Sequence, residues 1–185
     1  MNDSELGAAL AEHAYLEGDF VLRSGRRSRY YLDKYRFETQ PSLLAPLGER
    51  LAAAVAEYEP EATRLAGPAL GAVALAAAAS LASGLPFLIV RDEAKGYGTA
   101  NRLEGVWGAG ECVCVIEDVV TSGGAALEAV QTLRAAALRC STVVCVVDRE
   151  EGGVELLATH GVRLRPLFRA ADLLESRKSA ANPHR

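Results

Sequence analysis

Two adjacent acids stand between an apolar run and a loop of hydroxyl-bearing residues and glycines. The apolar residues 112–116 lead into Glu117 and Asp118, and the loop Thr121-Ser122-Gly123-Gly124 precedes a helical pattern. Such a loop at a helix N-terminus presents backbone N–H groups and a positive dipole end, which suit a phosphate. The acids would repel a phosphate, but they accept hydrogen bonds from hydroxyl groups. The arrangement predicts a ligand that carries both a phosphate and a diol, which is a sugar phosphate.

These residues need a fold that brings strand ends and helix starts together. Continuous apolar strands alternate with helical patterns along the chain, which is typical of a parallel sheet covered on both faces. We therefore expect an α/β fold with a parallel sheet of about five strands flanked by helices, with ligands bound beyond the carboxyl ends of the strands. Strands are expected at residues 20–22, 30–32, 63–66, 87–90, 112–116, 142–147 and 162–167, and helices at residues 5–16, 41–55, 71–83 and 125–138.

Length, composition and charge exclude several classes of protein. The 185 residues fit one domain, which we expect to span residues 1–185 with a frayed tail over 176–185. Half of the residues are hydrophobic and 24% are charged, as in a folded protein. A net charge of −4 disfavours nucleic-acid binding, and the longest apolar runs are broken by glycine and proline, so no membrane span is expected. The acidic N-terminus differs from a secretory signal, and we expect a cytoplasmic protein.

The cysteines and histidines do not predict a resident metal site. We expect the four cysteines to be buried, reduced thiols, with a disulfide or a metal site as the alternative, and the three histidines are scattered along the chain. The glycine motifs that bind dinucleotides and nucleoside triphosphates are absent from the sequence.

Residues 91–108 form a long segment between two expected buried strands. They contain four glycines among polar residues. Long loops in compact domains are usually functional or disordered. We therefore expect this segment to act as a lid over a ligand.

The stretch from Val113 to Ala126 resembles the phosphoribosyl diphosphate motif of the type I phosphoribosyltransferases. Further segments are similar to one member family, the orotate phosphoribosyltransferases. They are residues 22–33, which contain Ser-Gly-Arg-Arg-Ser; residues 67–72, similar to a diphosphate loop; residues 90–105, similar to a mobile catalytic loop; and residues 146–150, similar to a late base-binding segment. The resemblance covers residues 15–175, in order.

The resemblance implies an activity, a cofactor and an assembly. The family transfers the 5-phosphoribosyl group of phosphoribosyl diphosphate to a ring nitrogen of orotate, which gives orotidine 5′-phosphate and diphosphate in pyrimidine biosynthesis. Mg²⁺, bound mainly through the diphosphate, is implied as cofactor. A homodimer that shares the 91–108 loop between subunits is also implied, together with a small hood over about residues 1–40 on a core of about residues 41–175.

The resemblance also assigns roles around the sugar phosphate. Glu117 and Asp118 would hold the 2′ and 3′ hydroxyls, and Asp118 is one of three expected catalytic residues. The diphosphate loop would offer backbone amides through Leu70 and Gly71, which stand where some relatives carry Tyr-Lys, so this loop brings no side-chain cation. The remaining residues expected to contact the substrate here are Val119, Val120, Thr121, Ser122, Gly123, Gly124 and Ala125.

Four residues of the lid are implicated by the same resemblance. Arg91 and Lys95 would reach the diphosphate, and Lys95 and Tyr97 are the other two expected catalytic residues. Tyr97 stands where the family often has histidine. Asp92 stands where the family usually has lysine, which places an anion near an anionic leaving group unless Asp92 faces solvent or Arg102.

The base is expected to contact residues from two other segments. Arg23 matches a position usually occupied by lysine near the ribose and the base. Tyr31 and Leu32 would flank the orotate ring. Arg149 would pair with the orotate carboxylate, for which a planar two-pronged donor is apt.

Two alternatives remain open at this point. The first is a phosphoribosyltransferase for a purine or another heterocycle, which Arg149 and the Arg23 segment disfavour. The second is a non-enzymatic sensor of phosphoribosyl diphosphate, which Asp92 favours and the acidic composition disfavours for direct nucleic-acid binding.

Overall fold

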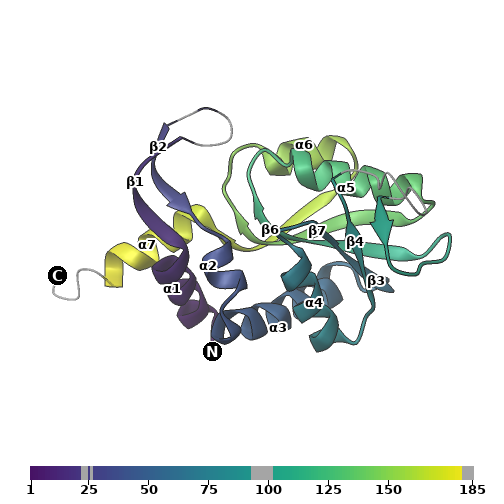
Figure 1. The fold of residues 1–185 in the computed structure, drawn as a ribbon, viewed down its shortest axis with the longest axis horizontal. Coiled ribbons are helices and arrows are strands. Elements are labelled where there is room, and N and C mark those ends of the chain that lie inside the picture. Colours follow the sequence, from purple (N-terminus) through teal and green to yellow (C-terminus); the bar gives the residue numbers. More distant parts are fainter. Residues whose placement is uncertain (22–24, 26, 93–101, 181–185) are drawn as a thin grey trace.

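The computed structural model describes residues 1–21, 25, 27–92 and 102–180, and at its centre is a six-stranded sheet (Figure 1). The strand order is β5-β4-β3-β6-β7-β8. All neighbouring strands are parallel except β5, which pairs antiparallel with β4. The strands are β3 (Arg64–Pro68), β4 (Phe87–Val90), β5 (Leu103–Glu104), β6 (Cys112–Val120), β7 (Arg139–Asp148) and β8 (Arg163–Arg169). The parallel sheet of about five strands is confirmed, with one short antiparallel strand added at its edge.

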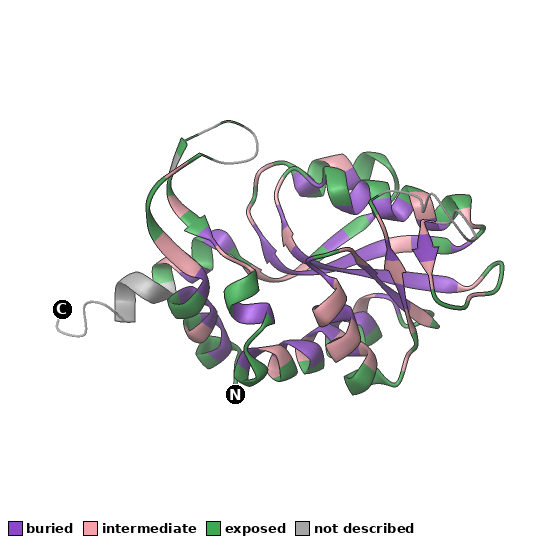
Figure 2. Ribbon diagram, in the orientation of Figure 1, coloured by how far each residue is buried: buried purple, intermediate pink, exposed green. Residues whose placement is uncertain are grey.

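Helices cover both faces of this sheet, which explains why its central strands are continuously apolar. On one face lie α3 (Pro41–Tyr58) and α4 (Val73–Ser83), and on the other lie α5 (Gly124–Ala135) and α6 (Gly153–Thr159). Figure 2 shows the central strands β6 and β7 as almost entirely buried. Gly48 of α3 allows the close contact with α4, because a Cβ at this position would lie 2.8 Å from the backbone carbon of Ala78.

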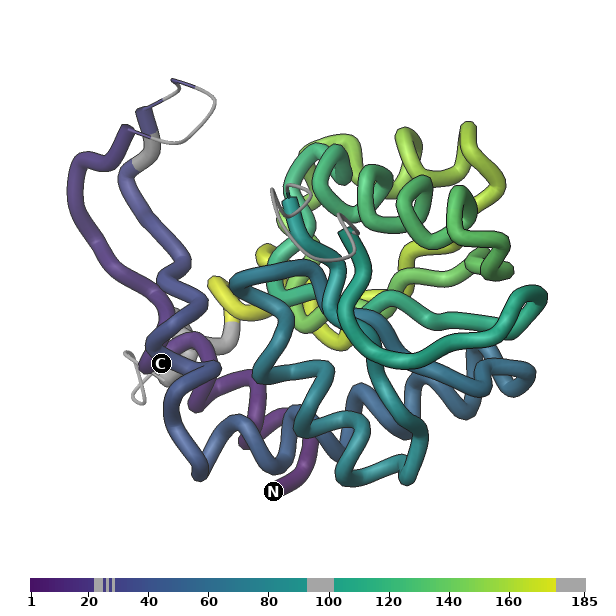
Figure 3. Tube along the Cα trace, turned by 45° about the vertical axis from the view of Figure 1, so that its right-hand side comes forward, coloured from purple at the N-terminus to yellow at the C-terminus, as the bar shows by residue number. Residues whose placement is uncertain are grey.

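The N-terminal residues form the small hood that we expected. They comprise α1 (Asp3–Ala14), the antiparallel hairpin of β1 (Tyr15–Val21) and β2 (Arg27–Leu32), and the short helix α2 (Tyr35–Glu38), which leads into α3. The hairpin projects away from the main sheet (Figure 3). Helix α1 is anchored by packing against α7 (Ala170–Ala180), and Leu6 and Leu10 are fully buried in the core that this packing shares with α3.

The structure departs from the expected elements where the sequence signal was short or polar. Helices α2 and α6 and strand β5 were not predicted, because each has seven residues or fewer. Strand β6 continues beyond Ile116 to Val120, so Glu117 and Asp118 belong to the strand. The tail that we expected to be frayed from Ser176 is helical as far as Ala180 in α7.

All four cysteines are free and buried, as expected. Within the described part of the chain, none of the helices has the length and apolarity that a membrane crossing requires.

Candidate active site

The carboxyl ends of the parallel strands meet at one edge of the sheet. The pairing register sets Pro68 of β3 beside Val90 of β4, and Val120 of β6 beside Asp148 of β7. The chain builds the sheet outward from β3 through β4, and then returns to β6 and builds in the other direction. The loops after β3 and β6 therefore flank a topological switch point, where open α/β sheets bind their ligands.

A cavity of about 760 Å³ lies at this switch point. Its walls come from the N-terminal end of α2, the turn after β3, the end of β4, and the junction of β6 with α5. Thirteen of the residues expected to contact the substrate line it: Leu70, Gly71, Arg91, Asp92, Glu117, Asp118, Val119, Val120, Thr121, Ser122, Gly123, Gly124 and Ala125.

Glu117 and Asp118 are both buried at the floor of this cavity, with exposed fractions of 6% and 4%. Asp118 Oδ1 accepts a hydrogen bond from the backbone N–H of Val119, and Asp118 Oδ2 accepts one from Lys34 Nζ at 2.5 Å. Glu117 Oε2 accepts from the Asp118 N–H at 3.3 Å. Burial, followed by the charge of Asp118, raises the pKa of Glu117 above its ordinary value.

A third acid, Glu38 of α2, lies beside Asp118 and was not anticipated from the sequence. It is 3% exposed, and burial together with the charge of Asp118 raises its pKa to about 8. Lys34 stands at the N-cap of the same helix and is paired with Asp118. Burial disfavours the charged form of Lys34, but the hydrogen bond and the charge of Asp118 outweigh this effect and raise its pKa. Glu117, Asp118 and the ammonium group of Lys34 therefore line the cavity, and Glu38 lies buried behind them, beside Asp118.

The loop between β6 and α5 has the backbone of an anion site. Gly123 adopts φ +82°, a left-handed conformation that favours glycine, and it precedes α5 with no side chain capping the first turn. A Cβ at Gly123 would lie 3.0 Å from the Cα of Gly153, so the position also has little room for a side chain. The N–H groups of the first turn of α5 are thus left for a ligand, and the helix dipole favours an anion there.

The turn after β3 forms the opposite wall. The Ala69 N–H donates to the carbonyl of Val90 at 2.7 Å, and the Ala72 N–H donates to the carbonyl of Pro68 at 3.1 Å. The peptide bond between Ala69 and Leu70 is cis, and the Leu70 side chain is largely exposed. Gly71, as the sequence indicated, brings no side chain to this wall.

The lid segment is described only at its two ends. Arg91 forms an ion pair with Glu104 at 3.7 Å. Arg102 donates to the carbonyl of Arg91 at 3.0 Å and to Glu128 Oε1 at 2.7 Å. Asp92 is exposed and lines the cavity. The two catalytic residues expected on this segment, Lys95 and Tyr97, lie outside the described residues.

The described residues expected to contact the base come from β2 and from the position directly after β7, and none of them is in the lining of the cavity. The Arg149 N–H donates to the carbonyl of Val120 at 2.9 Å, so Arg149 stands beside the cavity wall. Its side chain is 8% exposed, pairs with Glu151 at 3.1 Å, and lies over the ring of Tyr30 with 5.5 Å between the guanidinium carbon and the ring centroid. Among the described residues, Arg149 Nε has no hydrogen-bond partner.

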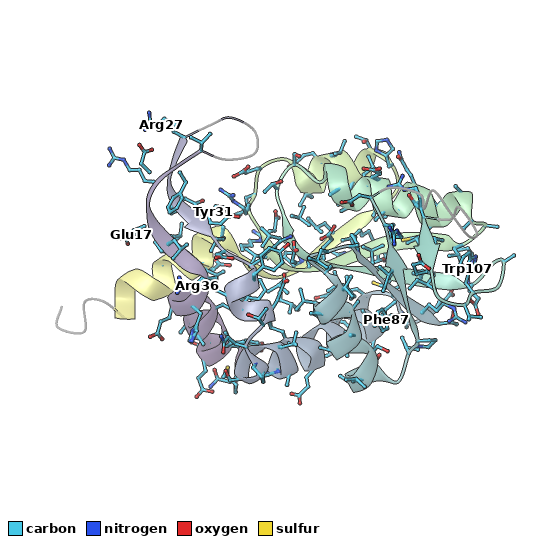
Figure 4. The ribbon with its side chains drawn as sticks, viewed as in Figure 1. Glu17, Arg27, Tyr31, Arg36, Phe87 and Trp107 are labelled. Atoms are coloured by element: carbon cyan, nitrogen blue, oxygen red, sulfur yellow. The ribbon has the colours of Figure 1, made fainter. Side chains whose placement is uncertain are left out.

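Tyr31 and Leu32 do not share one face, because they are successive residues of β2. Leu32 is 9% exposed in the core, whereas Tyr31, labelled in Figure 4, is 40% exposed. The ring of Tyr31 packs against that of Phe20. Tyr30 is the aromatic residue that lies by Arg149. Arg23 lies outside the described residues.

Sequence reasoning therefore missed Lys34, Glu38 and Tyr30. Two successive tyrosines do not indicate which one faces inward, so Tyr30 and Tyr31 could not be distinguished from their types. Lys34 and Asp118 are 84 residues apart, and only the fold shows that they meet. One usable signal was strand alternation, since Tyr30 shares a face with the apolar Leu32.

No protein-family model matches the chain. The chain is 50% identical over 174 residues to the orotate phosphoribosyltransferase of Methanocella arvoryzae, covering 93% of this chain and 97% of the relative. Among solved structures, it is similar to orotate phosphoribosyltransferase from Aeropyrum pernix, with a TM-score of 0.82, 35% identity, and coverage of 92% of this chain and 96% of the other. It is also similar to the Mycobacterium tuberculosis enzyme in complex with phosphoribosyl diphosphate, with a TM-score of 0.77, 29% identity, and coverage of 92% and 98%.

Proposed function

Because the chain belongs to the orotate phosphoribosyltransferase family, we propose that it transfers the 5-phosphoribosyl group of phosphoribosyl diphosphate to orotate, in pyrimidine biosynthesis. The observation that carries this proposal is the cavity itself. One wall is an uncapped helix start suited to a phosphate, and the floor holds the buried carboxyl groups of Glu117 and Asp118, which suit hydroxyls. A sugar phosphate satisfies both.

The reaction breaks the bond between C1 of the ribose and the diphosphate oxygen, whose electron pair leaves with the diphosphate. A ring nitrogen of orotate then forms the new bond to C1 and releases its proton, which leaves with the diphosphate. Positive charge builds on the sugar and negative charge on the leaving group, so catalysis consists mainly of placing charges and excluding water. In this site, Asp118 and Glu117 hold the ribose hydroxyls, the loop of residues 121–125 holds the 5′-phosphate, and Lys95 and Tyr97 of the lid act on the diphosphate.

Mg²⁺ fits this site as an ion that arrives with the substrate. Within the described residues, no three His, Cys, Asp or Glu side chains converge as metal ligands. The cavity does offer carboxylate oxygens from Glu117 and Asp118, the type of ligand that Mg²⁺ prefers, next to the expected ribose hydroxyls. When bound, the ion neutralises part of the charge on the diphosphate.

Arg149 is proposed to select the base. Its side chain is nearly buried, pairs with Glu151 and lies over Tyr30, and its backbone N–H is hydrogen-bonded to Val120 of the cavity wall. A buried cation that faces a ligand recognises a carboxylate strongly, because charge-assisted hydrogen bonds gain strength away from water. Orotate carries such a carboxylate and uracil does not, so Arg149 favours orotate over another base.

The enzyme is proposed to be a cytoplasmic single-domain homodimer in which the lid serves the partner's site. Free, buried thiols are usual in a reducing compartment. Subunit sharing is tested by mixing the Lys95→Ala and Asp118→Asn variants after reversible dissociation. If the lid crosses between subunits, random pairing makes half of the dimers mixed, each with one intact site, and restores about a quarter of wild-type activity. No recovery, with dimers confirmed by sedimentation, would contradict the shared lid.

The activity is tested by following orotate absorbance with phosphoribosyl diphosphate and Mg²⁺. Orotate consumption with equal release of diphosphate is expected. The two alternatives are separated by a panel of bases in the diphosphate-release assay: turnover with a purine alone would favour a different base specificity, and binding of phosphoribosyl diphosphate without turnover of any base would favour a sensor.

A further inference from the structure

Lys34 brings a positive charge into the cavity from outside the sheet. It precedes α2, the short helix that joins the hairpin to α3, and its ammonium group reaches Asp118 Oδ2 at 2.5 Å. The Lys34 side chain is 31% exposed and lines the same cavity as the turn after β3. This ammonium is therefore accessible to a ligand as well as to Asp118.

The space that Lys34 occupies exists because residue 71 is glycine. A Cβ at Gly71 would overlap Asp118 Oδ2 and Lys34 Nζ, and would lie 3.1 Å from Lys34 Cε. The lysine head thus stands where a side chain of the turn after β3 would otherwise be. The turn lacks a cation of its own, and Lys34 supplies one at the same place from a distant part of the sequence.

The other described cations that line the cavity are engaged on its lid side. Arg91 pairs with Glu104, which is not in the cavity lining, and Arg102 pairs with Glu128, which lines the cavity from α5. Lys34 is the cation at the floor, and its partner Asp118 is also the group expected to accept from the ribose hydroxyls. An ammonium has three donors, so Lys34 can keep one hydrogen bond to Asp118 and direct another at an anionic group above it.

We propose that Lys34 is a substrate-binding residue, which donates from Nζ to the diphosphate group of phosphoribosyl diphosphate and so replaces a side-chain cation of the turn formed by residues 68–72. This inference rests on the proposed function. Without ligand, Asp118 holds the ammonium in place. With the ribose hydroxyls on Asp118, the ammonium faces the diphosphate bound along the Gly71 backbone.

The test compares two ligands that carry a diphosphate group with one that lacks it. Binding of phosphoribosyl diphosphate, inorganic diphosphate and ribose 5-phosphate is measured by calorimetry for wild type and for Lys34→Met, which keeps the apolar stem and removes the charge. Loss of one charge-assisted contact should weaken the first two ligands about 10- to 100-fold and ribose 5-phosphate about twofold or less. Arg36→Met is the matched control, since Arg36 is exposed on the same helix (Figure 4) and should leave all three affinities unchanged.

A relocated lysine provides the second arm. Lys34→Met combined with Gly71→Lys should recover part of the affinity for diphosphate, because the new ammonium group starts from the space that the lysine head has left, while the Cβ at residue 71 still requires the Asp118 carboxylate to rotate away. Gly71→Lys alone should bind worse than wild type, because both ammonium groups compete for that space.

Equal weakening of diphosphate and ribose 5-phosphate by Lys34→Met, or a lowered melting temperature with unchanged affinities, would show that Lys34 only ties α2 to the sheet and would overturn the inference. Failure of wild type to bind phosphoribosyl diphosphate would instead contradict the proposed function, so the two failures are distinguishable.

Discussion

At the scale of single residues, Asp118 concentrates the most interactions at the site. It is buried, accepts hydrogen bonds from Val119 and Lys34, and lies beside Glu38 and Glu117. Burial, followed by the charge of Asp118, raises the pKa values of Glu38 and Glu117, and Lys34 is the described cation that lowers both. Of the three carboxyl groups, Asp118 is the one that forms an ion pair with Lys34.

Asp118→Asn should raise the KM for phosphoribosyl diphosphate by about 10- to 100-fold, because the charge-assisted hydrogen bonds that it loses are each worth about 1.5–3 kcal/mol. Steady-state kinetics at saturating orotate, with a melting curve as control for the fold, measures this effect. Unchanged kinetics in a protein that melts like wild type would remove Asp118 from the ribose site.

Asp92 is the residue that fits the proposed reaction least well, since it is exposed on the cavity wall near an anionic leaving group. Asp92→Lys should raise kcat/KM for phosphoribosyl diphosphate. Because the lid is solvated and its charges are screened, we expect about 1–2 kcal/mol of attraction between the new lysine and the diphosphate. This corresponds to a gain in kcat/KM of roughly five- to thirtyfold, which should increase at low ionic strength.

The control for Asp92→Lys is Glu155→Lys, which makes the same change in net charge on an exposed part of α6. It should leave kcat/KM within about twofold of wild type, since charges beyond a Debye length are screened. A fall in activity of Asp92→Lys alone would show that Asp92 has a positive role, such as ordering the lid through Arg102.

At the scale of elements, the sequence predicted best where burial is continuous. Strand β4 was expected at its observed bounds, and the central strands and α3, α4 and α5 were expected within a few residues of theirs. Strand β6 was predicted too short because Glu117 and Asp118 are acids in a buried strand, which the site requires and apolar patterning does not indicate. Helix α2 has four residues and no periodicity, so neither Lys34 nor Glu38 could be placed from it.

The loop before α5 depends on the backbone of Gly123. Gly123→Ala forces a side chain into φ +82° and against Gly153, and the left-handed conformation alone costs about 1–2 kcal/mol. We expect a melting temperature lower by about 2–8 °C and a weaker affinity for phosphoribosyl diphosphate and inorganic phosphate.

Gly152→Ala is the matched control for the loop. Gly152 has φ +97° with open space around a Cβ, and it lies outside the cavity lining. Gly152→Ala should lower the melting temperature about as much as Gly123→Ala does, but leave the affinity for phosphate unchanged. If both variants bind phosphate equally well, the shape of the loop at Gly123 is not what holds the phosphate.

At the scale of the whole molecule, the site joins the hood to the core, and this junction affects stability. Glu38 belongs to the segment that links the hairpin to α3, and it is buried against the acids of β6. Its folded-state pKa of about 8 lies above its ordinary value of 4.5, so the folded protein binds this proton more tightly than the unfolded chain. The free energy of unfolding therefore falls as the pH rises from 4.5 towards 8, and this loss is complete above that range.

Glu38→Gln removes the titration and keeps the shape of the side chain. Between pH 5 and 8, one such group contributes a slope of at most about 1.4 kcal/mol per pH unit, or about 3–6 °C per pH unit for a chain of this length. Melting curves at several pH values should show a shallower decline for Glu38→Gln than for wild type. If the melting temperatures of wild type and Glu38→Gln fall equally as the pH rises, Glu38 does not hold its proton in the folded protein.

The family resemblance predicted most of the residues around the cavity, because its motifs lie on the loops after β3 and β6. It could not predict that a lysine of the hood would meet Asp118, since that contact depends on how α2 sits against the sheet. Tyr30 was missed for a different reason: residue type does not distinguish it from Tyr31, and the alternation that places Tyr30 on the face of Leu32 is the signal that identifies it.

The most direct test of the whole account is the ratio of kcat/KM for orotate to that for uracil, measured for wild type and for Arg149→Ala. The two bases differ by the carboxylate that Arg149 is proposed to bind, which is worth about 2–4 kcal/mol when the partner charge is buried. Wild type should therefore prefer orotate by roughly 30- to 1,000-fold, and Arg149→Ala should lose most of this preference while its KM for phosphoribosyl diphosphate changes little. A wild type without preference for orotate, or a preference that survives in Arg149→Ala, would contradict the account.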